Sequence, residues 1–67
     1  MKLKANIIFD LRYNSRARMQ VGLDVDRSEA AIYQWLRFEQ HKFLTKENVL
    51  ISISKVLGKP MNELIED

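Results

Sequence analysis

The sequence contains no cysteine, one histidine and two glycines, and these shortages exclude several kinds of site. Without cysteine, the chain can form neither a disulfide framework nor a thiolate zinc site. His41 cannot build a metal cluster alone, so we expect no metal and expect His41 to be a solvated surface residue. Gly22 and Gly58 stand far apart, so no glycine-rich loop is available to cradle the phosphates of a cofactor. We therefore expect no cofactor.

Catalytic patterns are missing as well. The serines have a single histidine to pair with and no supporting motif, so the sequence indicates no nucleophile and base. The carboxylates of Asp24 and Asp26 stand beside Arg27 and are best interpreted as solvated side chains. We expect that the protein is not an enzyme.

Long apolar runs are also absent. No stretch approaches the roughly 20 apolar residues that a membrane-spanning helix needs. Residues 1–9 lack both the long apolar region and the small-residue cleavage site of a secretion signal. We expect a soluble cytoplasmic protein with no membrane partner.

The charge of the chain is small in sum but unevenly distributed. The 67 residues suffice for one small domain, 1–67, with a net charge of +2. Residues 1–18 carry five basic side chains and one acidic one, whereas the rest of the chain carries six basic and eight acidic side chains. This asymmetry indicates an N-terminal third that can face phosphate groups, with the acidic C-terminal end turned away.

The stretch from Ala17 to Leu36 is the part around which the rest is organised. It predicts two short helices separated by a three-residue break, Val25–Arg27. Ser28 follows the break, where its hydroxyl can cap the second helix by accepting from a free backbone N–H. Gly22 stands where the two helices need to approach closely, and Asp26 tolerates the left-handed conformation of a tight turn.

The second of these helices separates apolar from hydrogen-bonding side chains on a helical wheel. One face holds Ile32, Trp35, Leu36 and Glu39. The opposite face holds Ala30, Tyr33, Gln34, Arg37 and His41. A helix that enters the major groove of DNA needs a buried back and a front that reaches base edges. Any surface helix of a small bundle has the same pattern, so the preceding turn is what favours DNA binding.

The N-terminal part predicts a helix over residues 5–14. Its apolar stripe consists of Ile7, Ile8 and Leu11, extended backwards by Leu3. Phe9 and Tyr13 lie off this stripe, and we expect them to pack against another helix. Base stacking by both rings and a dimer contact by Phe9 are the alternatives.

The next helix is predicted over residues 17–24, with Asn14 or Ser15 as its cap. Arg16 and Arg18 then fall in its first turn, where positive charges oppose the helix dipole at a cost of a few tenths of a kcal/mol. This placement is understandable if both guanidinium groups and the free backbone amides meet a phosphate. Ordinary solvated arginines are the alternative.

After the central stretch, the chain is predicted to turn over residues 38–48. Phe38, Phe43 and Leu44 are interpreted as packing residues of this turn, and Thr45 as the cap of the next helix.

The C-terminal part fits two interpretations. Residues 49–56 alternate between apolar and polar and are rich in β-branched side chains, as a strand would be. They also fit helical spacing, and Gly58 follows as a helix terminator. We therefore predict a helix over 49–57. Pro60 is predicted to open a last short helix, whose inward-facing residues would be Met61, Leu64 and Ile65.

Two segments resemble the Cro/C1-type (XRE-like) helix-turn-helix domains of phage and bacterial repressors. SEAAIYQWL (residues 28–36) is similar to the recognition helix of that family, and VLISISKVLGKPMNELIED (49–67) is similar to its closing pair of helices around an LG turn. The resemblance extends over residues 6–67. It implies an all-α, compact four- to five-helix bundle with a helix-turn-helix motif, as in lambda repressor.

The sequence departs from the family at three positions. Gly22 and Asp26 stand where the family usually has alanine and glycine. Leu36 replaces a common glutamate, and this removes one partner of the ion pair that often ties the recognition helix to the first helix.

The resemblance implies a small phage or prophage-type transcriptional repressor. Such a protein binds double-stranded DNA sequence-specifically and occupies its operator as a homodimer. The residues expected to contact bases are Ser28, Glu29, Ala30, Tyr33 and Gln34. The residues expected to contact phosphates are Arg16, Arg18, Arg27, Arg37 and Lys42. The position of Arg18 resembles a backbone-phosphate clamp of the family.

The chemistry of three of these side chains suggests particular bases. Gln34 can bind adenine with two hydrogen bonds, Ala30 can contact a thymine methyl group, and Glu29 can accept from cytosine N4. Because phosphates repel its carboxylate, Glu29 is expected to narrow specificity rather than add affinity.

Two alternatives belong to other functional classes. One is a protein-interaction module, such as an antitoxin or anti-repressor, built on the same scaffold and marked by an apolar patch of Phe9, Tyr33 and Phe38. The other is a structural domain that needs a partner to fold.

Overall fold

The computed structural model describes all 67 residues, most of which lie in helices. In chain order the elements are β1 (Lys2–Leu3), α1 (Ala5–Arg12), α2 (Ser15–Val25), α3 (Glu29–Arg37), α4 (His41–Leu44), α5 (Glu47–Leu57), the 3-10 helix η1 (Met61–Glu63) and β2 (Ile65–Glu66). The predicted all-α class is therefore confirmed. The ambiguous segment 49–56 is helical, as predicted, and Gly58 ends α5 in the left-handed conformation. None of the helices has the combination of length and apolar character that crossing a membrane requires.

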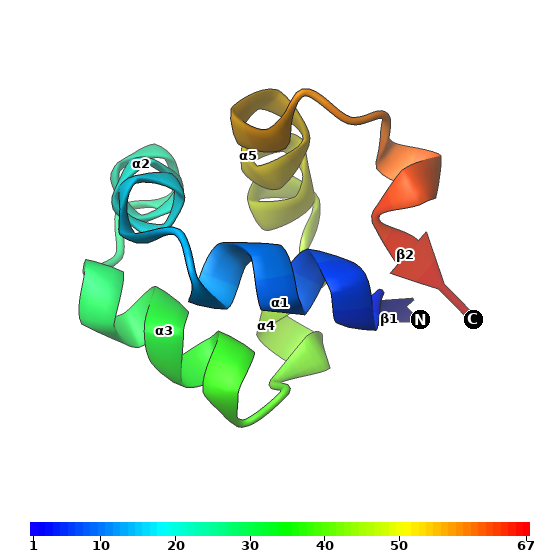
Figure 1. Cartoon of the computed structure of the whole chain (residues 1–67), viewed down its shortest axis with the longest axis horizontal. Coiled ribbons are helices and arrows are strands. Elements are labelled where there is room, and N and C mark those ends of the chain that lie inside the picture. Colours follow the sequence, from blue (N-terminus) through cyan, green and yellow to red (C-terminus); the bar gives the residue numbers. More distant parts are fainter.

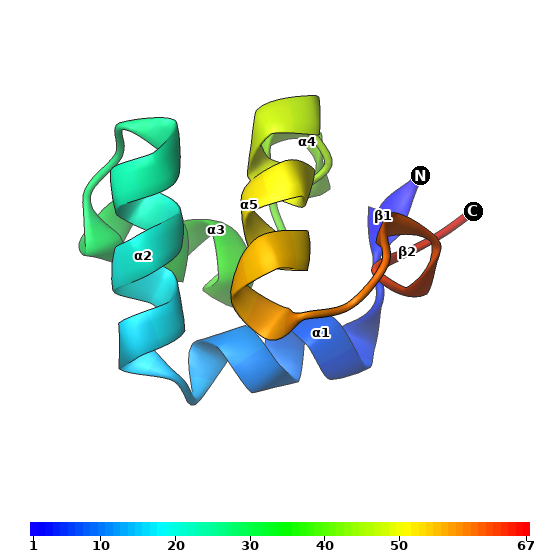
Figure 2. The ribbon, with the colours of Figure 1, turned by 90° about the horizontal axis from the view of Figure 1, so that it is seen from above.

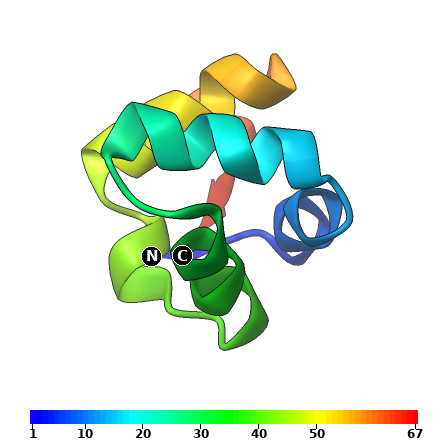
Figure 3. The same ribbon diagram turned by 90° about the vertical axis from the view of Figure 1, so that its left-hand side faces the viewer.

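The helices α2, α3 and α5 define the shape of the molecule. α2 and α5 lie side by side (Figure 2), and α2 packs on both α5 and α3. In Figure 1, α2 is seen nearly end-on while α3 runs across the lower left. In Figure 3, which is turned by 90° about the vertical axis, α2 instead runs across the picture. α2 and α3 thus cross at a steep angle and are joined by a short turn, which is a helix-turn-helix arrangement.

The core consists of aliphatic side chains from each of the five α-helices, together with Leu3 and Leu64. Eight of its leucines and isoleucines are almost completely buried: Leu3, Ile7, Leu11, Ile32, Leu36, Leu44, Ile53 and Leu64. Each such side chain contributes about 1.5–3 kcal/mol relative to an exposed one. Trp35 of α3 stacks on Phe43 of α4, with ring centroids 5.2 Å apart, and this pair attaches α4 to α3.

α2 is longer than predicted and is capped at both ends. It begins at Ser15 because the side chain of Asn14 accepts a hydrogen bond from the backbone N–H of Ala17 at 3.0 Å. Of the two predicted caps, Asn14 is the one used. α2 ends at Val25 because Asp26 adopts the left-handed conformation, with φ of 58°. α1, by contrast, ends at Arg12, two residues earlier than predicted.

The two ends of the chain meet in a small sheet that the sequence did not predict. β1 and β2 pair antiparallel, with Leu3 opposite Ile65, so both termini lie on one side of the molecule (Figure 1). The N–H of Leu3 donates to Nδ1 of His41 at 3.1 Å, and only 21% of the His41 side chain is exposed. The prediction of a solvated His41 is therefore wrong, because the short helix α4 brings the imidazole against β1.

Three aromatic side chains expected in packing positions lie on the surface. Phe9, Tyr13 and Phe38 are 62%, 71% and 59% exposed, respectively. Phe9 of α1 and Tyr13, which follows the last residue of α1, contact each other with ring centroids 4.7 Å apart. The packing predictions for these residues are wrong because aliphatic side chains already fill the small core. Phe43 and Leu44 do pack as predicted.

Two predictions for the C-terminal half need correction. Thr45 does not cap α5, since its hydroxyl donates to the carbonyl oxygen of His41 at 2.6 Å and Lys46 is the residue before the helix. Pro60 precedes η1 as predicted, and Leu64 is buried, but Met61 is exposed. Leu64 lies just after η1, which ends at Glu63, so its burial is not set by the helix.

Candidate nucleic-acid interface

The turn between α2 and α3 lies directly against α2 at Gly22. A Cβ atom built on Gly22 would lie 2.6 Å from the backbone oxygen of Arg27, which is closer than real Cβ atoms approach other atoms. The N–H of Arg27 donates to the carbonyl of Gly22 at 2.8 Å and holds the turn in this position. The predicted close approach at Gly22 is therefore confirmed, together with the left-handed Asp26.

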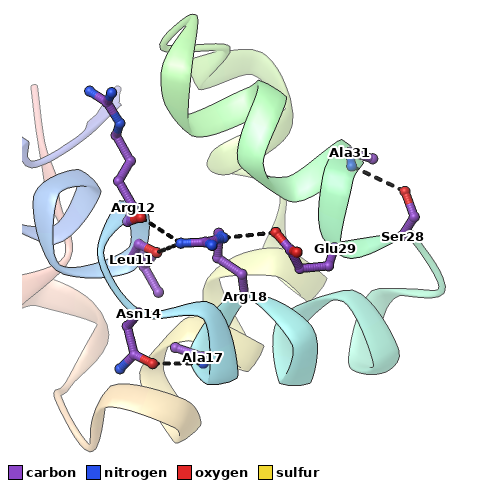
Figure 4. Close-up of polar contacts among 8 residues, drawn as sticks. All are labelled: Leu11, Arg12, Asn14, Ala17, Arg18, Ser28, Glu29 and Ala31. Carbon is purple, nitrogen blue, oxygen red and sulfur yellow. Dashed lines mark hydrogen bonds and ion pairs between the residues drawn. The ribbon is translucent and has the colours of Figure 1, made fainter.

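The first turn of α3 is capped as predicted. The hydroxyl oxygen of Ser28 accepts a hydrogen bond from the backbone N–H of Ala31 at 3.1 Å (Figure 4). The break between the two helices comprises residues 26–28, one residue later than predicted. The direction of α3 is thus fixed from its first residue.

α3 has a buried face and an exposed face, as the helical wheel predicted. Ile32 and Leu36 are buried and Trp35 is half-buried. On the opposite side, Ala30, Gln34 and Arg37 are exposed and Tyr33 is half-buried. Two residues of the wheel do not belong to the helix, because α3 ends at Arg37: Glu39 has a left-handed backbone, and His41 is part of α4.

Arg18 makes a set of contacts that the sequence did not predict. Its Nε donates to Oε2 of Glu29 at 2.9 Å, and its Nη1 donates to the carbonyl oxygens of Leu11 and Arg12 (Figure 4). Its guanidinium carbon lies 5.2 Å from the ring centroid of Tyr33. Only 12% of the Arg18 side chain is exposed. This one side chain therefore connects the end of α1 with the start of α3.

These contacts bear on the departure from the family at position 36, where Leu36 replaces a glutamate that often forms an ion pair with the first helix. Arg18 supplies a connection between α1 and α3 even though Leu36 cannot form an ion pair. A phosphate contact of Arg18 stays a prediction, and it would have to come from Nη2, the guanidinium nitrogen that makes no hydrogen bond within the protein.

The other predicted phosphate contacts are solvent-exposed side chains distributed over α2, the turn after it, α3 and α4. Arg16 lies in the first turn of α2, and Arg27 lies in the turn that follows α2. Arg37 is the last residue of α3, where its guanidinium covers the ring of Phe38 at 5.4 Å, and Lys42 is in α4. The five predicted base-contact residues, in contrast, lie together in Ser28 and the first two turns of α3.

Asp24 is not simply solvated, as the sequence suggested. Its carboxylate accepts from the buried hydroxyl of Ser52 at 2.7 Å and from the side-chain amide of Gln20 at 2.9 Å. These hydrogen bonds, with a smaller contribution from the charge of Lys55, hold the pKa of Asp24 below its usual value. The hydrogen bond from Ser52 connects α2 to α5 and so supports α2 on the side facing α5.

Comparison of the chain with protein-family models, with curated protein sequences and with solved structures found no match. The function must therefore be inferred from the geometry of this chain alone.

Proposed function

We propose that the protein binds double-stranded DNA sequence-specifically through the exposed face of α3. The observation that supports this proposal most is the combination of a capped helix, a buried apolar back and an exposed polar front on a tight turn after α2. A helix in this setting has the size and the free side chains to enter a major groove.

The side chains of the exposed face have the chemistry for reading bases. Gln34 can make two hydrogen bonds to adenine, and the methyl group of Ala30 can contact the methyl group of thymine. Glu29 can accept from the amino group of cytosine, while Ser28 and Tyr33 offer hydroxyl groups at the edges of the face. The basic side chains Arg16, Arg27, Arg37 and Lys42 are the candidates for holding the DNA backbone.

The small size of this face favours binding as a homodimer. One helix reads few base pairs, so two copies on a two-fold symmetric site would be needed for selectivity. Bound at a promoter, such a dimer would act as a phage- or prophage-type transcriptional repressor by occupying its operator.

Selection from a pool of random DNA duplexes, followed by a salt titration, tests this proposal. We expect one enriched palindromic sequence whose binding constant falls steeply with salt concentration, because phosphate contacts release counterions. Binding that is weak and independent of sequence would contradict the proposal.

The substitution Gln34→Ala then tests the role of α3. We expect a loss of about 1–3 kcal/mol of discrimination at one base pair, since one side chain is removed from the exposed face. Gln40→Ala, which removes an exposed glutamine outside α3, is the matched control and should leave discrimination unchanged. An equal loss of affinity on every sequence after Gln34→Ala would remove this residue from the set of base contacts.

A second candidate function is a protein-interaction module such as an antitoxin or anti-repressor. It is favoured by the exposed aromatic pair formed by Phe9 of α1 and Tyr13, the residue that follows α1. Under this alternative, Phe9→Ala would abolish binding to a protein partner, and no salt-dependent DNA binding would be seen.

A further inference from the structure

Arg18 and Glu29 form an ion pair beside the face of α3 proposed to read DNA. Oε2 of Glu29 accepts from Arg18 at 2.9 Å, whereas Oε1 makes no hydrogen bond within the protein. The Glu29 side chain is 40% exposed and the Arg18 side chain 12% exposed. The pair therefore has an inner end that is held by the protein (Figure 4) and an outer end, the partly exposed Glu29 carboxylate, that is open to a ligand.

The inner end is fixed by several contacts. Nη1 of Arg18 binds the carbonyl oxygens of Leu11 and Arg12 at the C-terminal end of α1, where the helix dipole favours a positive charge. The ring of Tyr33, one turn after Glu29 in α3, lies against the same guanidinium. Because the guanidinium is planar and held at these points, it can fix the direction of the carboxylate that it binds.

The outer end, the Glu29 carboxylate, can bind only hydrogen-bond donors. An ionised carboxylate is only an acceptor of hydrogen bonds, and the donors in the major groove are the amino groups of cytosine and adenine. A free carboxylate would be repelled by nearby phosphates, but the positive charge of Arg18 offsets this repulsion. A side chain already held in place also loses less conformational entropy on binding.

We infer that Arg18 is a positioning residue that holds Glu29 for reading an amino-bearing base, cytosine or adenine, in the major groove. This inference rests on the proposed function. It gives Arg18 a role in discrimination between bases, which differs from the phosphate contact that the sequence suggested. It also makes Glu29 depend on a residue of another helix for its specificity.

Base preference at each position of the selected duplex tests the inference. For Arg18→Met, we expect the preference at one base pair to fall about tenfold, because the carboxylate of Glu29 is no longer held in place. Glu29→Gln should relax the preference at the same base pair, because an amide both donates and accepts. Arg16→Met, on the same helix, is the matched control: it should weaken binding to all sequences and reduce the salt dependence, with base preference retained.

Two further measurements separate positioning from folding. Thermal melts identify variants that have lost the fold. If Arg18→Met unfolds, the test uses Glu29→Gln and Arg18→Lys instead. Arg18→Lys retains the positive charge but not the planar guanidinium group. We expect Arg18→Lys to keep part of the preference. If wild-type protein selects a sequence and Glu29→Gln leaves the preference unchanged, the inference is wrong and the proposed function stands. If wild-type protein selects no sequence, the proposed function and the inference fail together.

Discussion

The two links that flank α3 have the same length but are held in different ways. Residues 26–28 join α2 to α3 and residues 38–40 join α3 to α4, and each link contains one left-handed residue, Asp26 or Glu39. The first link is additionally fixed by the Ser28 cap and by the close approach to Gly22. The second link is held by backbone hydrogen bonds, and no side chain caps α4.

The proposed function gives this difference a meaning, because the candidate base contacts lie at one end of α3. The N-terminal end of α3, which is fixed by the Ser28 cap and by the close approach of the turn to Gly22, carries the candidate base contacts, from Ser28 to Gln34. The other end is anchored mainly by burial of Leu36 and by the stack of Trp35 on Phe43. A helix held in this way has a defined start and direction, which a reading helix requires.

The largest effect is expected for Gly22→Ala. Alanine in a helix interior normally stabilises a protein by about 1 kcal/mol relative to glycine. Here the new methyl group would collide with the backbone oxygen of Arg27, so we expect the free energy of unfolding to fall by about 1–3 kcal/mol. Urea denaturation measures this change. A stabilised Gly22→Ala variant would show that the first link is not fixed by close approach.

Gly58→Ala is the matched control for this substitution. A Cβ atom at Gly58 meets no other atom, but the residue has a left-handed backbone with φ of 66°. We expect a loss of about 1 kcal/mol from backbone strain alone.

The next largest effect is expected at the caps of the two helices that follow the links. Ser28→Ala should cost about 1 kcal/mol, because the N–H of Ala31 loses its acceptor. Gln40→Ala, at the equivalent position before α4, should change stability by less than about 0.5 kcal/mol, since Gln40 makes no side-chain cap. If both variants lost the same free energy of unfolding in urea denaturation, the two links would be held equally strongly, contrary to this account.

A smaller effect is expected for glycine at the left-handed residues. Both Asp26→Gly and Glu39→Gly relieve backbone strain, and we expect stabilisation of up to about 1 kcal/mol. Glu39→Gly should gain more, because aspartate tolerates the left-handed conformation better than glutamate. A larger gain at Asp26 would contradict this order and would place more strain in the first link than in the second.

The smallest effect concerns the support of α2 by α5 and depends on pH. Because the pKa of Asp24 is lower in the folded protein than the usual 3.8, the ionised carboxylate favours folding. This contribution is present above pH 3.8 and is lost as the pH falls through the lowered pKa. Asp24→Asn should therefore reduce the acid dependence of the melting temperature, and an unchanged acid dependence would exclude a contribution of Asp24.

The parts of the structure that the sequence could predict depend on neighbouring residues. The cap at Ser28, the left-handed Asp26 and the buried pair of Ile32 and Leu36 all follow from local spacing and residue type. α4 was missed because a helix of four residues is too short to show a period. The pairing of β1 with β2 was missed because it joins the two ends of the chain.

The candidate site was predicted less well wherever its contacts join distant elements. Arg18 was placed in the correct helix, but its partners lie at the end of α1 and the start of α3, and only the packing of three helices turns it inward. The exposed Phe9 and Phe38 show a related limit. Hydrophobicity alone does not tell which apolar residues a small core will accept.

The most direct test of DNA binding by α3 is an amide chemical-shift titration of the protein with its selected duplex. We expect the largest shifts in residues 28–37 and in the first turn of α2, with little change around Lys55 on α5. Shifts centred on Phe9 of α1 and on Tyr13 just after it, with α3 unchanged, would contradict the proposal that α3 is the reading helix.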